Sequence, residues 1–551
     1  MADATTPSSK KKRDGVRALS GVAVFVAAIC ALPMLAVLLA AISGGTETVQ
    51  LLAQTVLGGY ARTTFTLVVL VALGTFSIGV GAAWLVTMTR FPGVRLFEIG
   101  LVLPLAFPAY VLAYAYTHVL DHPGIVQTTL RDLTGWGPRD YWFPEIRSLG
   151  GAAAMLVLVL YPYVYLLARA AFLQQSGTTF LAARALGSSP WAAFFKVSLP
   201  LARPAIAGGV LLTVMETIAD FGTVAYFGVQ TFATGIYTSW FSLFDRVGAA
   251  QLALCLLSFA LLLAMLERMQ RGDAKYHDPA RRAKAAPAVQ LRGWRAGLAM
   301  MLCGVPVVFG ALLPIAVLFV MGLGSEQNLF SARYLGFIKN SATLALVAAV
   351  VTVTAAISVG FFQRMHGGRL AQGAAYVARL GYAVPGGVIA VGLLVPFAAF
   401  DNALDAWMRS TFDISTGLLI TGSIWLLVVA YMVRFLAAAL GAYEGGQAMV
   451  HVNMDAASRS LGQGPMGTLR RVHLPILAPS LLTALLIVFV DVMKELPATL
   501  IMRPFNFDTL AVQAYRLASD ERLEGAAVPS LVIVAMGLLP VILICRQVGR
   551  R

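Results

Sequence analysis

Charged residues and cysteine are both scarce in this sequence. Asp, Glu, Lys and Arg make up only 12% of the 551 residues, whereas about 25% is usual in soluble domains. The four cysteines lie far apart within apolar stretches, without the C-x-x-C spacing of a zinc or redox site. These absences exclude an ordinary soluble protein, and we expect neither a disulfide framework nor a stable metal site.

The chain also lacks a phosphate-binding loop. The motif G-x-x-x-x-G-K-[ST] does not occur, and no Gly-Lys dipeptide exists in the sequence. No nucleophile and base stand at a catalytic spacing either. The sequence therefore predicts a protein that is not an enzyme, with no catalytic residue and no cofactor bound by this chain.

Long apolar runs are what the sequence has in abundance. Hydrophobic residues make up 59% of the chain, and the mean hydropathy is +0.79. About 20 apolar residues in a helix cross the hydrocarbon core of a bilayer. Twelve runs approach or exceed this length: 18–42, 61–87, 97–119, 150–171, 205–228, 249–266, 296–323, 341–362, 374–400, 418–438, 478–502 and 526–544. We predict an all-α polytopic membrane protein with about twelve transmembrane helices.

The distribution of charge predicts how these helices are oriented. The formal net charge is +15, and Lys and Arg concentrate in alternate connections, while acidic residues gather in the others, notably 401–413 and 508–524. Basic connections usually stay in the cytoplasm. Lys10 to Arg13 precede a first run that is too long for a signal peptide. We therefore expect both termini to be cytoplasmic.

The chain contains an internal repeat. Leu186-Gly187 followed by Leu199-Pro200 recurs 275 positions later as Leu461-Gly462 followed by Leu474-Pro475. Six runs precede the polar stretch 268–295 and six follow it. The sequence thus predicts a cytoplasmic tail (1–17), a first transmembrane domain (18–267), a cytoplasmic linker (268–295) and a second transmembrane domain (296–551). Both six-helix repeats enter the membrane from the same side.

Each repeat has a distinctive cytoplasmic loop, at 178–203 and at 453–479. In each, a short Ala-rich helix precedes a glycine that can take left-handed torsion angles, and a second segment ends in Leu-Pro. The residues that define the two loops are Ala182, Ala183, Gly187, Leu199 and Pro200 in the first, and Asp455, Ala456, Ala457, Gly462, Leu474 and Pro475 in the second.

These loops resemble the EAA loop of permease subunits of ATP-binding cassette (ABC) importers. The resemblance covers essentially the whole chain and implies that each loop docks a short helix into a groove on an ATPase. The glutamate usual in that motif is replaced by Leu181 in the first loop and by Ala456 in the second, where Asp455 stands one residue earlier. The resemblance further implies separate ATPase subunits, two copies in number, that bind ATP and Mg.

Five ionisable residues lie at or within the fifth and eleventh apolar runs, where charge is costly. They are Glu216, Asp220, Asp491, Lys494 and Glu495. The repeat pairs Glu216 with Asp491 and Asp220 with Glu495, and residues four apart share a helix face. One interpretation is a translocation pathway that suits a cation. The other is structural: Lys494 neutralises a neighbouring acid, and Asp220 binds free backbone groups at a kink.

The stretches 216–237 and 494–511 resemble the ferric-iron permeases with two fused halves. This resemblance implies transport of Fe(III) across the bacterial cytoplasmic (inner) membrane by alternating access, with a periplasmic or lipid-anchored substrate-binding protein. Other branches of the importer family, which transport phosphonate, thiamine, polyamine or sulfate, share the same architecture. An ion-coupled secondary transporter is the alternative from another class. Tyr110, Tyr114 and Tyr116 offer hard oxygen ligands, but we expect them at the membrane interface, where tyrosine gathers.

Overall fold

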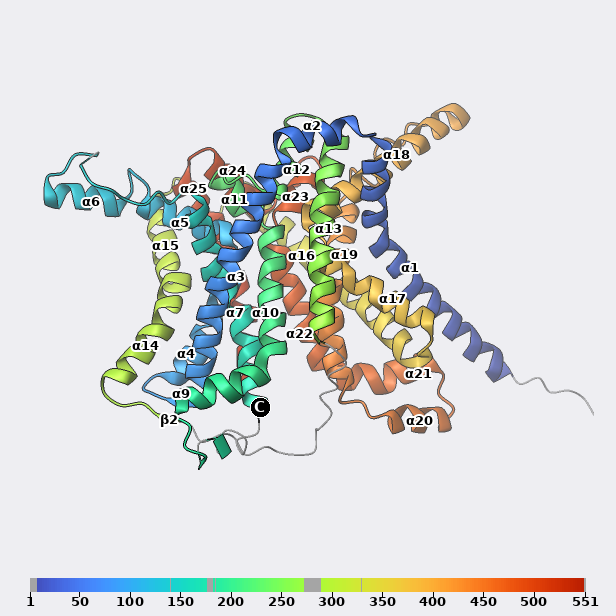
Figure 1. Cartoon of the computed structure of the whole chain (residues 1–551). Coiled ribbons are helices and arrows are strands. Elements are labelled where there is room, and N and C mark those ends of the chain that lie inside the picture. Colours follow the sequence, from blue (N-terminus) through green and yellow to red (C-terminus); the bar gives the residue numbers. More distant parts are fainter. Residues whose placement is uncertain are drawn as a thin grey trace, which may run out of the picture. The chain divides into compact units, whose positions relative to one another are not determined.

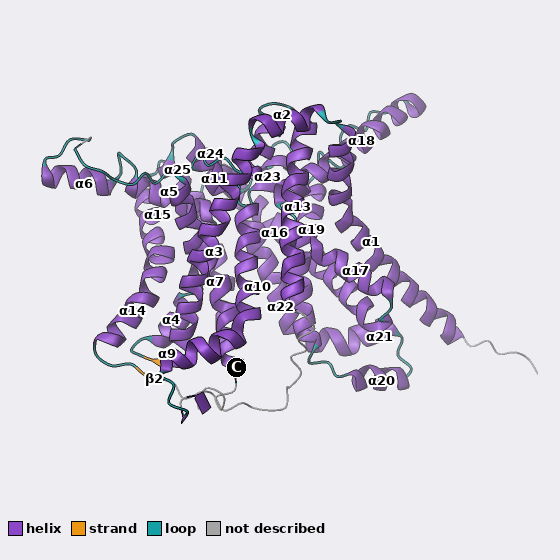
Figure 2. Cartoon of the chain, viewed as in Figure 1, coloured by secondary structure: helices purple, strands orange, loops and turns teal. Residues whose placement is uncertain are grey.

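The computed structural model describes residues 7–138, 140–175, 182–183, 185–271, 289–328 and 330–549. Helices make up nearly all of this part (Figure 2). Its only strands, β1 (Thr89–Arg90) and β2 (Val289–Gln290), form one short parallel pair among the described residues. The predicted all-α class is confirmed.

The helices of the first repeat are α1 (Pro7–Ser43), α2 (Glu47–Thr55), α3 (Leu57–Met88), α4 (Val94–Gly100), η1 (Leu103–Ala106), α5 (Ala109–Leu120), α6 (Ile125–Thr134), α7 (Leu149–Gln174), α9 (Pro190–Ala193), η2 (Phe194–Ser198), α10 (Leu199–Ala219), α11 (Gly222–Tyr226), α12 (Phe232–Phe241) and α13 (Arg246–Arg271). Those of the second are α14 (Trp294–Val307), η3 (Val308–Leu312), α15 (Leu313–Gly324), α16 (Ala332–His366), α17 (Arg369–Leu380), η4 (Gly381–Ala383), α18 (Gly386–Phe412), α19 (Ile424–Gln447), α20 (Val452–Ser460), α21 (Pro465–Thr468), η5 (Leu469–His473), α22 (Leu474–Met493), α23 (Pro497–Met502), α24 (Leu510–Ser519) and α25 (Leu523–Gly549).

Eleven helices of the described part are long and apolar enough to cross a membrane, and the count is twelve if one bent pair forms a single span. The bent pair, Val94–Ala106 and Ala109–Thr134, turns by 95° where Pro108 stands. It corresponds to the predicted run 97–119. The predicted run 374–400 also differs from a single helix, because η4 separates α17 from α18 before Pro385.

Two compact units make up the molecule, and each takes helices from both repeats. Unit 1 comprises Met1–Val49, Ser239–Leu257 and Leu335–Thr509; unit 2 comprises Gln50–Thr238, Ser258–Tyr334 and Leu510–Arg551. In unit 1, α1 from the first repeat lies along α17 and α18 from the second. Gly392 of α18 permits this approach, because a Cβ there would overlap the Pro33 carbonyl oxygen. The two compact units therefore do not coincide with the two sequence repeats.

The predicted tail and linker lie partly outside the described residues. Helix α1 begins at Pro7, so the described part of the tail is helical. Helix α13 ends at Arg271, and 272–288 of the predicted linker are outside the described part. Figure 1 shows the long helices of both repeats, with α6 extending sideways beyond α5 in unit 2.

Wide helical turns mark the start of three long helices, and proline explains them. The π-helical turns η2, η3 and η5 each come directly before a Leu-Pro pair, at Pro200, Pro314 and Pro475. A proline ring clashes with the carbonyl four residues earlier and offers no amide proton, and a wider turn relieves that clash. Both predicted loops contain this turn at the same repeat position.

Candidate functional site: the paired loops and the broken spans

The two predicted loops end their first helices in the same way. Gly187 and Gly462 have φ values of +84° and +76°. The amide that follows each glycine donates back across the turn, from Ser188 to the Ala183 carbonyl at 3.1 Å and from Gln463 to the Ser458 carbonyl at 3.1 Å. This is the Schellman arrangement of a helix end. The predicted left-handed glycines are confirmed in both repeats.

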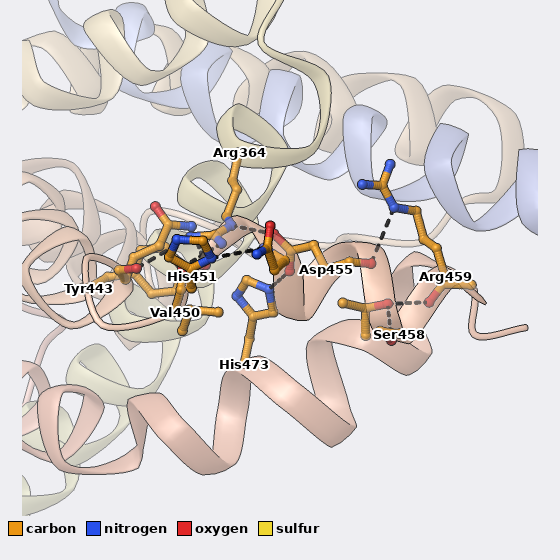
Figure 3. A network of polar contacts seen from close by, with 12 residues as sticks. Arg364, Tyr443, Val450, His451, Asp455, Ser458, Arg459 and His473 are labelled. Atoms are coloured by element: carbon orange, nitrogen blue, oxygen red, sulfur yellow. Dashed lines mark hydrogen bonds and ion pairs between the residues drawn. The ribbon is translucent and has the colours of Figure 1, made fainter. Parts of the chain in front are cut away.

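Asp455 anchors the second loop from within (Figure 3). Its side chain is 8% exposed, and its two carboxylate oxygens lie 2.8 Å from Arg364 Nε and 2.7 Å from His473 Nε2. Arg364 comes from the end of α16 and also donates to the Val450 carbonyl at 2.7 Å. His473 ends η5 and packs edge-on against the Phe361 ring. One carboxylate thus ties α20 to α16 and to the start of α22.

The electrostatics of this network favour an ionised Asp455. Burial alone would raise the pKa of its carboxyl group, but hydrogen bonds from His473 and Arg364 and their charges outweigh that effect. The net pKa lies below the ordinary value of 3.8. Asp455 is therefore a charged residue that holds the loop from inside, and its carboxylate is not exposed on the surface of the loop.

The first loop is held by aromatic packing instead. Trp84 of α3 lies 4.7 Å from the Trp191 ring and 5.0 Å from the Phe194 ring, measured between ring centroids. The position that corresponds to His473 is Ser198, whose carbonyl accepts from Gln175 Nε2 at 2.8 Å. Leu181, at the position of the missing glutamate, lies outside the described residues. The repeat conserves the loop's backbone but not its attachment.

One side chain on each loop stands out from the surface. Leu186 and Leu461 precede the two glycines and are 87% and 80% exposed. Ala182, Ala456 and Ala457 are exposed beside them. Each loop therefore presents a small apolar surface at an equivalent position.

The fifth span ends earlier than the sequence predicts. Helix α10 ends at Ala219, and Asp220 follows with an extended backbone. Its carboxylate accepts from the amides of Thr223 and Val224, both at 3.1 Å, and from the Thr223 hydroxyl at 3.0 Å. Asp220 thus caps α11 and does not continue the helix face of Glu216. The structural interpretation of Asp220 is the one the geometry supports.

The eleventh span breaks in the same way, with an additional charge. Helix α22 ends at Met493, and Glu495 accepts from the amides of Ala498 and Thr499, at 3.1 and 3.2 Å, at the start of α23. Glu495 is 5% exposed and also binds Arg434 of α19 at 3.1 Å. A buried carboxylate that caps a helix and pairs with arginine has most of its acceptor sites filled.

Sequence reasoning missed Arg434, and it left the partner of Lys494 open. Lys494 Nζ lies 2.8 Å from Asp491, three residues earlier, and therefore neutralises Asp491 and not Glu495. The expectation that Asp491 and Glu495 share one helix face is wrong, because α22 ends between them. Arg434, Arg364 and His473 are distant in sequence from the acids they bind. Only their presence within or beside apolar runs could have signalled a role.

Comparison with known proteins bears on these loops. Residues 75–271, which include the first loop, match the family described as binding-protein-dependent transport system inner membrane component. Across 93% of the chain and 95% of the relative, the sequence is 25% identical to the Fe(3+)-transport system permease protein FbpB 2 of Haemophilus influenzae. The chain therefore contains a domain of this transport-permease family, and along nearly its whole length it is similar to a ferric permease.

Two further relatives show how the repeat relates to other permeases. The permease is 23% identical to the ferric transport system permease protein FbpB of Actinobacillus pleuropneumoniae, over 84% of this chain and 68% of the relative. The molybdenum transport system permease protein ModB of Escherichia coli is 29% identical over 36% of this chain and 85% of its own length. Most of that shorter permease therefore corresponds to a little over a third of this one.

Proposed function

We propose that this permease imports Fe(III) across the bacterial inner membrane by alternating access, driven by two separate ATPase subunits that bind ATP and Mg. The doubled helix–glycine–helix loop carries the proposal, because two docking loops on one chain fit two ATPases. The resemblance to ferric permeases along the chain supports the cargo. Both termini lie in the cytoplasm, and a periplasmic or lipid-anchored binding protein delivers the ion.

The geometry assigns different tasks to the parts of each loop. Leu186 and Leu461 enter the grooves of the ATPases, because they are the most exposed apolar side chains among the described residues of their loops. In the second loop, Asp455 transmits the movement of α20 to α16 and α22 through Arg364 and His473. In the first loop, the rings of Trp84, Trp191 and Phe194 form the corresponding connection.

Docking can be tested with charge substitutions at the two leucines. The double variant Leu186→Asp/Leu461→Asp should lose the ATPase during co-purification, because burying an unpaired carboxylate in an apolar groove is costly. Leu133→Asp is the matched control, since Leu133 is 82% exposed on α6 but outside both loops. Retention of the ATPase by the double variant would contradict the proposed docking.

Two rival functions make different predictions. Similarity to the molybdenum permease ModB supports an ABC permease for another small substrate, which would keep the dependence on ATPase but change the cargo. Phosphonate, thiamine, polyamine and sulfate are the other candidates of that kind. An ion-coupled secondary transporter would need no ATPase at all. The acids at the span breaks do not favour it, because Asp220 and Glu495 cap short helices and Asp491 pairs with Lys494.

A further inference from the structure

Three buried hydroxyl groups in unit 2 have no hydrogen-bond partner among the described residues. They belong to Tyr114 and Thr117 of α5 and to Tyr226 at the end of α11. Tyr114 is fully buried, Thr117 is 1% exposed and Tyr226 is 9% exposed. Most buried polar groups in proteins are hydrogen-bonded, so a group of unpartnered hydroxyls calls for an explanation.

The three hydroxyls lie in one place. The Tyr114 and Tyr226 rings meet edge to face with centroids 4.8 Å apart, and the Thr117 side chain lies next to the Tyr226 hydroxyl. The Tyr110 ring is 5.7 Å from that of Tyr114. The sequence suggested that Tyr110, Tyr114 and Tyr116 lie at the lipid interface. In the structure all three side chains are buried inside the protein.

Tyr116 shows what an ordinary structural tyrosine looks like on the same helix. Its hydroxyl donates to the Phe309 carbonyl at 2.7 Å, so its burial leaves no polar group unsatisfied. Tyr114, two residues earlier, has no such partner. The contrast indicates that the Tyr114 hydroxyl serves something other than the packing of α5.

The surroundings of the hydroxyls are acidic. Asp220 and Tyr515 both lie within electrostatic range of the Tyr114 hydroxyl, and both residues are half-buried. Arg147 lies over the Tyr226 ring at 5.2 Å, but Asp121 and Glu521 bind it at 3.0 and 2.6 Å. Asp121 and Glu521 therefore share the Arg147 guanidinium, whereas Asp220 lies near Tyr114.

We propose that Tyr110, Tyr114, Tyr226 and Tyr515, with Asp220 beside them, form a transient binding site for the transported cation. We call this group the phenol cluster. Phenolate and carboxylate oxygens are hard ligands that suit a small, highly charged ion such as Fe(III). The inference rests on the proposed function, since it assumes a cationic cargo.

The chemistry of the cluster favours release as well as capture. Each phenol that binds the ion as a phenolate gives one proton to solvent, and no electron is transferred. Asp220 already accepts three hydrogen bonds from α11, so it contributes negative charge and positions Tyr226 more than it supplies free ligand atoms. A site made mainly of neutral phenols in the absence of the ion binds it without trapping it.

The internal repeat does not duplicate the phenol cluster. The offset that relates Pro108 to Pro385 makes Gly387 and Val391 the counterparts of Tyr110 and Tyr114. The offset that relates Gly187 to Gly462 makes Ile501 the counterpart of Tyr226. None of these side chains has an oxygen atom. The buried tyrosines are therefore not part of the framework that both repeats share.

The test compares iron binding and uptake by the assembled transporter. Wild type and Tyr114→Phe/Tyr226→Phe are reconstituted with the ATPase and the iron-loaded binding protein, and uptake of radioactive iron is measured. The detergent-purified complex is also mixed with Fe(III) nitrilotriacetate to detect the visible charge-transfer band of iron-bound phenolate. We expect the double variant to lose the band and about tenfold or more of its uptake rate.

Tyr161→Phe is the matched control. Tyr161 is fully buried and its hydroxyl also has no partner in the described part of the chain, but it lies on α7 outside the cluster. Thermal unfolding should be nearly unchanged in all variants, since the Tyr114 and Tyr161 hydroxyls have no hydrogen bond to lose and Tyr226 has at most a neighbouring threonine hydroxyl. A lower unfolding temperature in the double variant, or equal losses in the control, would overturn the proposal.

The outcomes separate this inference from the proposed function. If wild type imports iron with ATP and the double variant does so at the same rate, the phenol cluster holds only water, and the inference is wrong while the function stands. If wild type imports no iron, the proposed cargo is wrong. Import of iron by wild type together with loss in the double variant alone supports both.

Discussion

At the scale of single residues, Asp455 is the side chain on which the second loop depends most. It is the shared acceptor of Arg364 and His473. Asp455→Ala leaves the Arg364 guanidinium, 15% exposed, without its carboxylate, and removing one partner of a buried ion pair costs about 3–5 kcal/mol. We expect a lower unfolding temperature of the purified permease and weaker stimulation of ATPase activity.

A control and a rescue make this prediction specific. Asp132→Ala, at an exposed position of α6, should leave the unfolding temperature nearly unchanged. Arg364→Met/Asp455→Leu removes both charges and should recover much of the lost stability, because an apolar pair can replace a buried ion pair. Equal unfolding temperatures for wild type and Asp455→Ala would contradict the role given to this network.

The same carboxylate predicts a dependence on pH. The folded-state pKa of Asp455 lies below its ordinary value of 3.8, so its contribution to stability is fully present above pH 3.8 and is lost as the pH falls through the folded-state pKa. The difference in unfolding temperature between wild type and Asp455→Ala should therefore be constant near neutrality and shrink below pH 3.8. A difference that grows on acidification would show that the sign is wrong.

The sequence identified many of the important residues but few of their partners. Glu216, Asp220, Asp491, Lys494 and Glu495 stand out because charge is rare in apolar runs. Nothing local in the sequence pairs Glu495 with Arg434, because the two are 61 positions apart. Such pairs arise from helix packing, which a hydropathy pattern does not specify.

At the scale of elements, the two span breaks are alike in backbone and unlike in charge. Asp220 and Glu495 each cap a short helix through residues three and four positions later. Only Glu495 also neutralises a buried arginine. The internal repeat allowed the two acids to be aligned from the sequence. The early ends of α10 and α22 could not be predicted, because the apolar runs continue past the residues where these helices end.

This difference predicts that replacing the carboxylate by an amide has a small effect at Asp220 and a large one at Glu495. Asp220→Asn keeps a capping oxygen and should change the unfolding temperature little, whereas Asp220→Ala loses the cap at a cost of about 1 kcal/mol. Glu495→Gln keeps the shape but leaves Arg434 uncompensated, which should cost about 3–5 kcal/mol. Thermal unfolding of the three variants measures the order. Equal tolerance of Asp220→Asn and Glu495→Gln would show that the Arg434 pair is unimportant.

At the scale of the whole molecule, the repeat was readable from the sequence and the exchange of helices was not. The spacing from Gly187 to Pro200 recurs without change at Gly462 and Pro475, and it predicted both loops. Nothing in the pattern indicated that α1 would pack on α18 from the other repeat. An apolar helix can pack against several other apolar helices of similar composition. Which helices become neighbours depends on how closely they fit, as where Gly392 meets Pro33.

The most direct test of the account is ATP-dependent uptake of radioactive iron into proteoliposomes that contain this permease, its ATPase and the loaded binding protein. Phosphonate, thiamine, polyamine, sulfate and molybdate serve as comparison substrates. The account predicts iron uptake that needs all three proteins and stops when the ATPase cannot hydrolyse ATP. Uptake of a comparison substrate in place of iron would contradict the assigned cargo, and uptake by the permease alone under an ion gradient would contradict the importer itself.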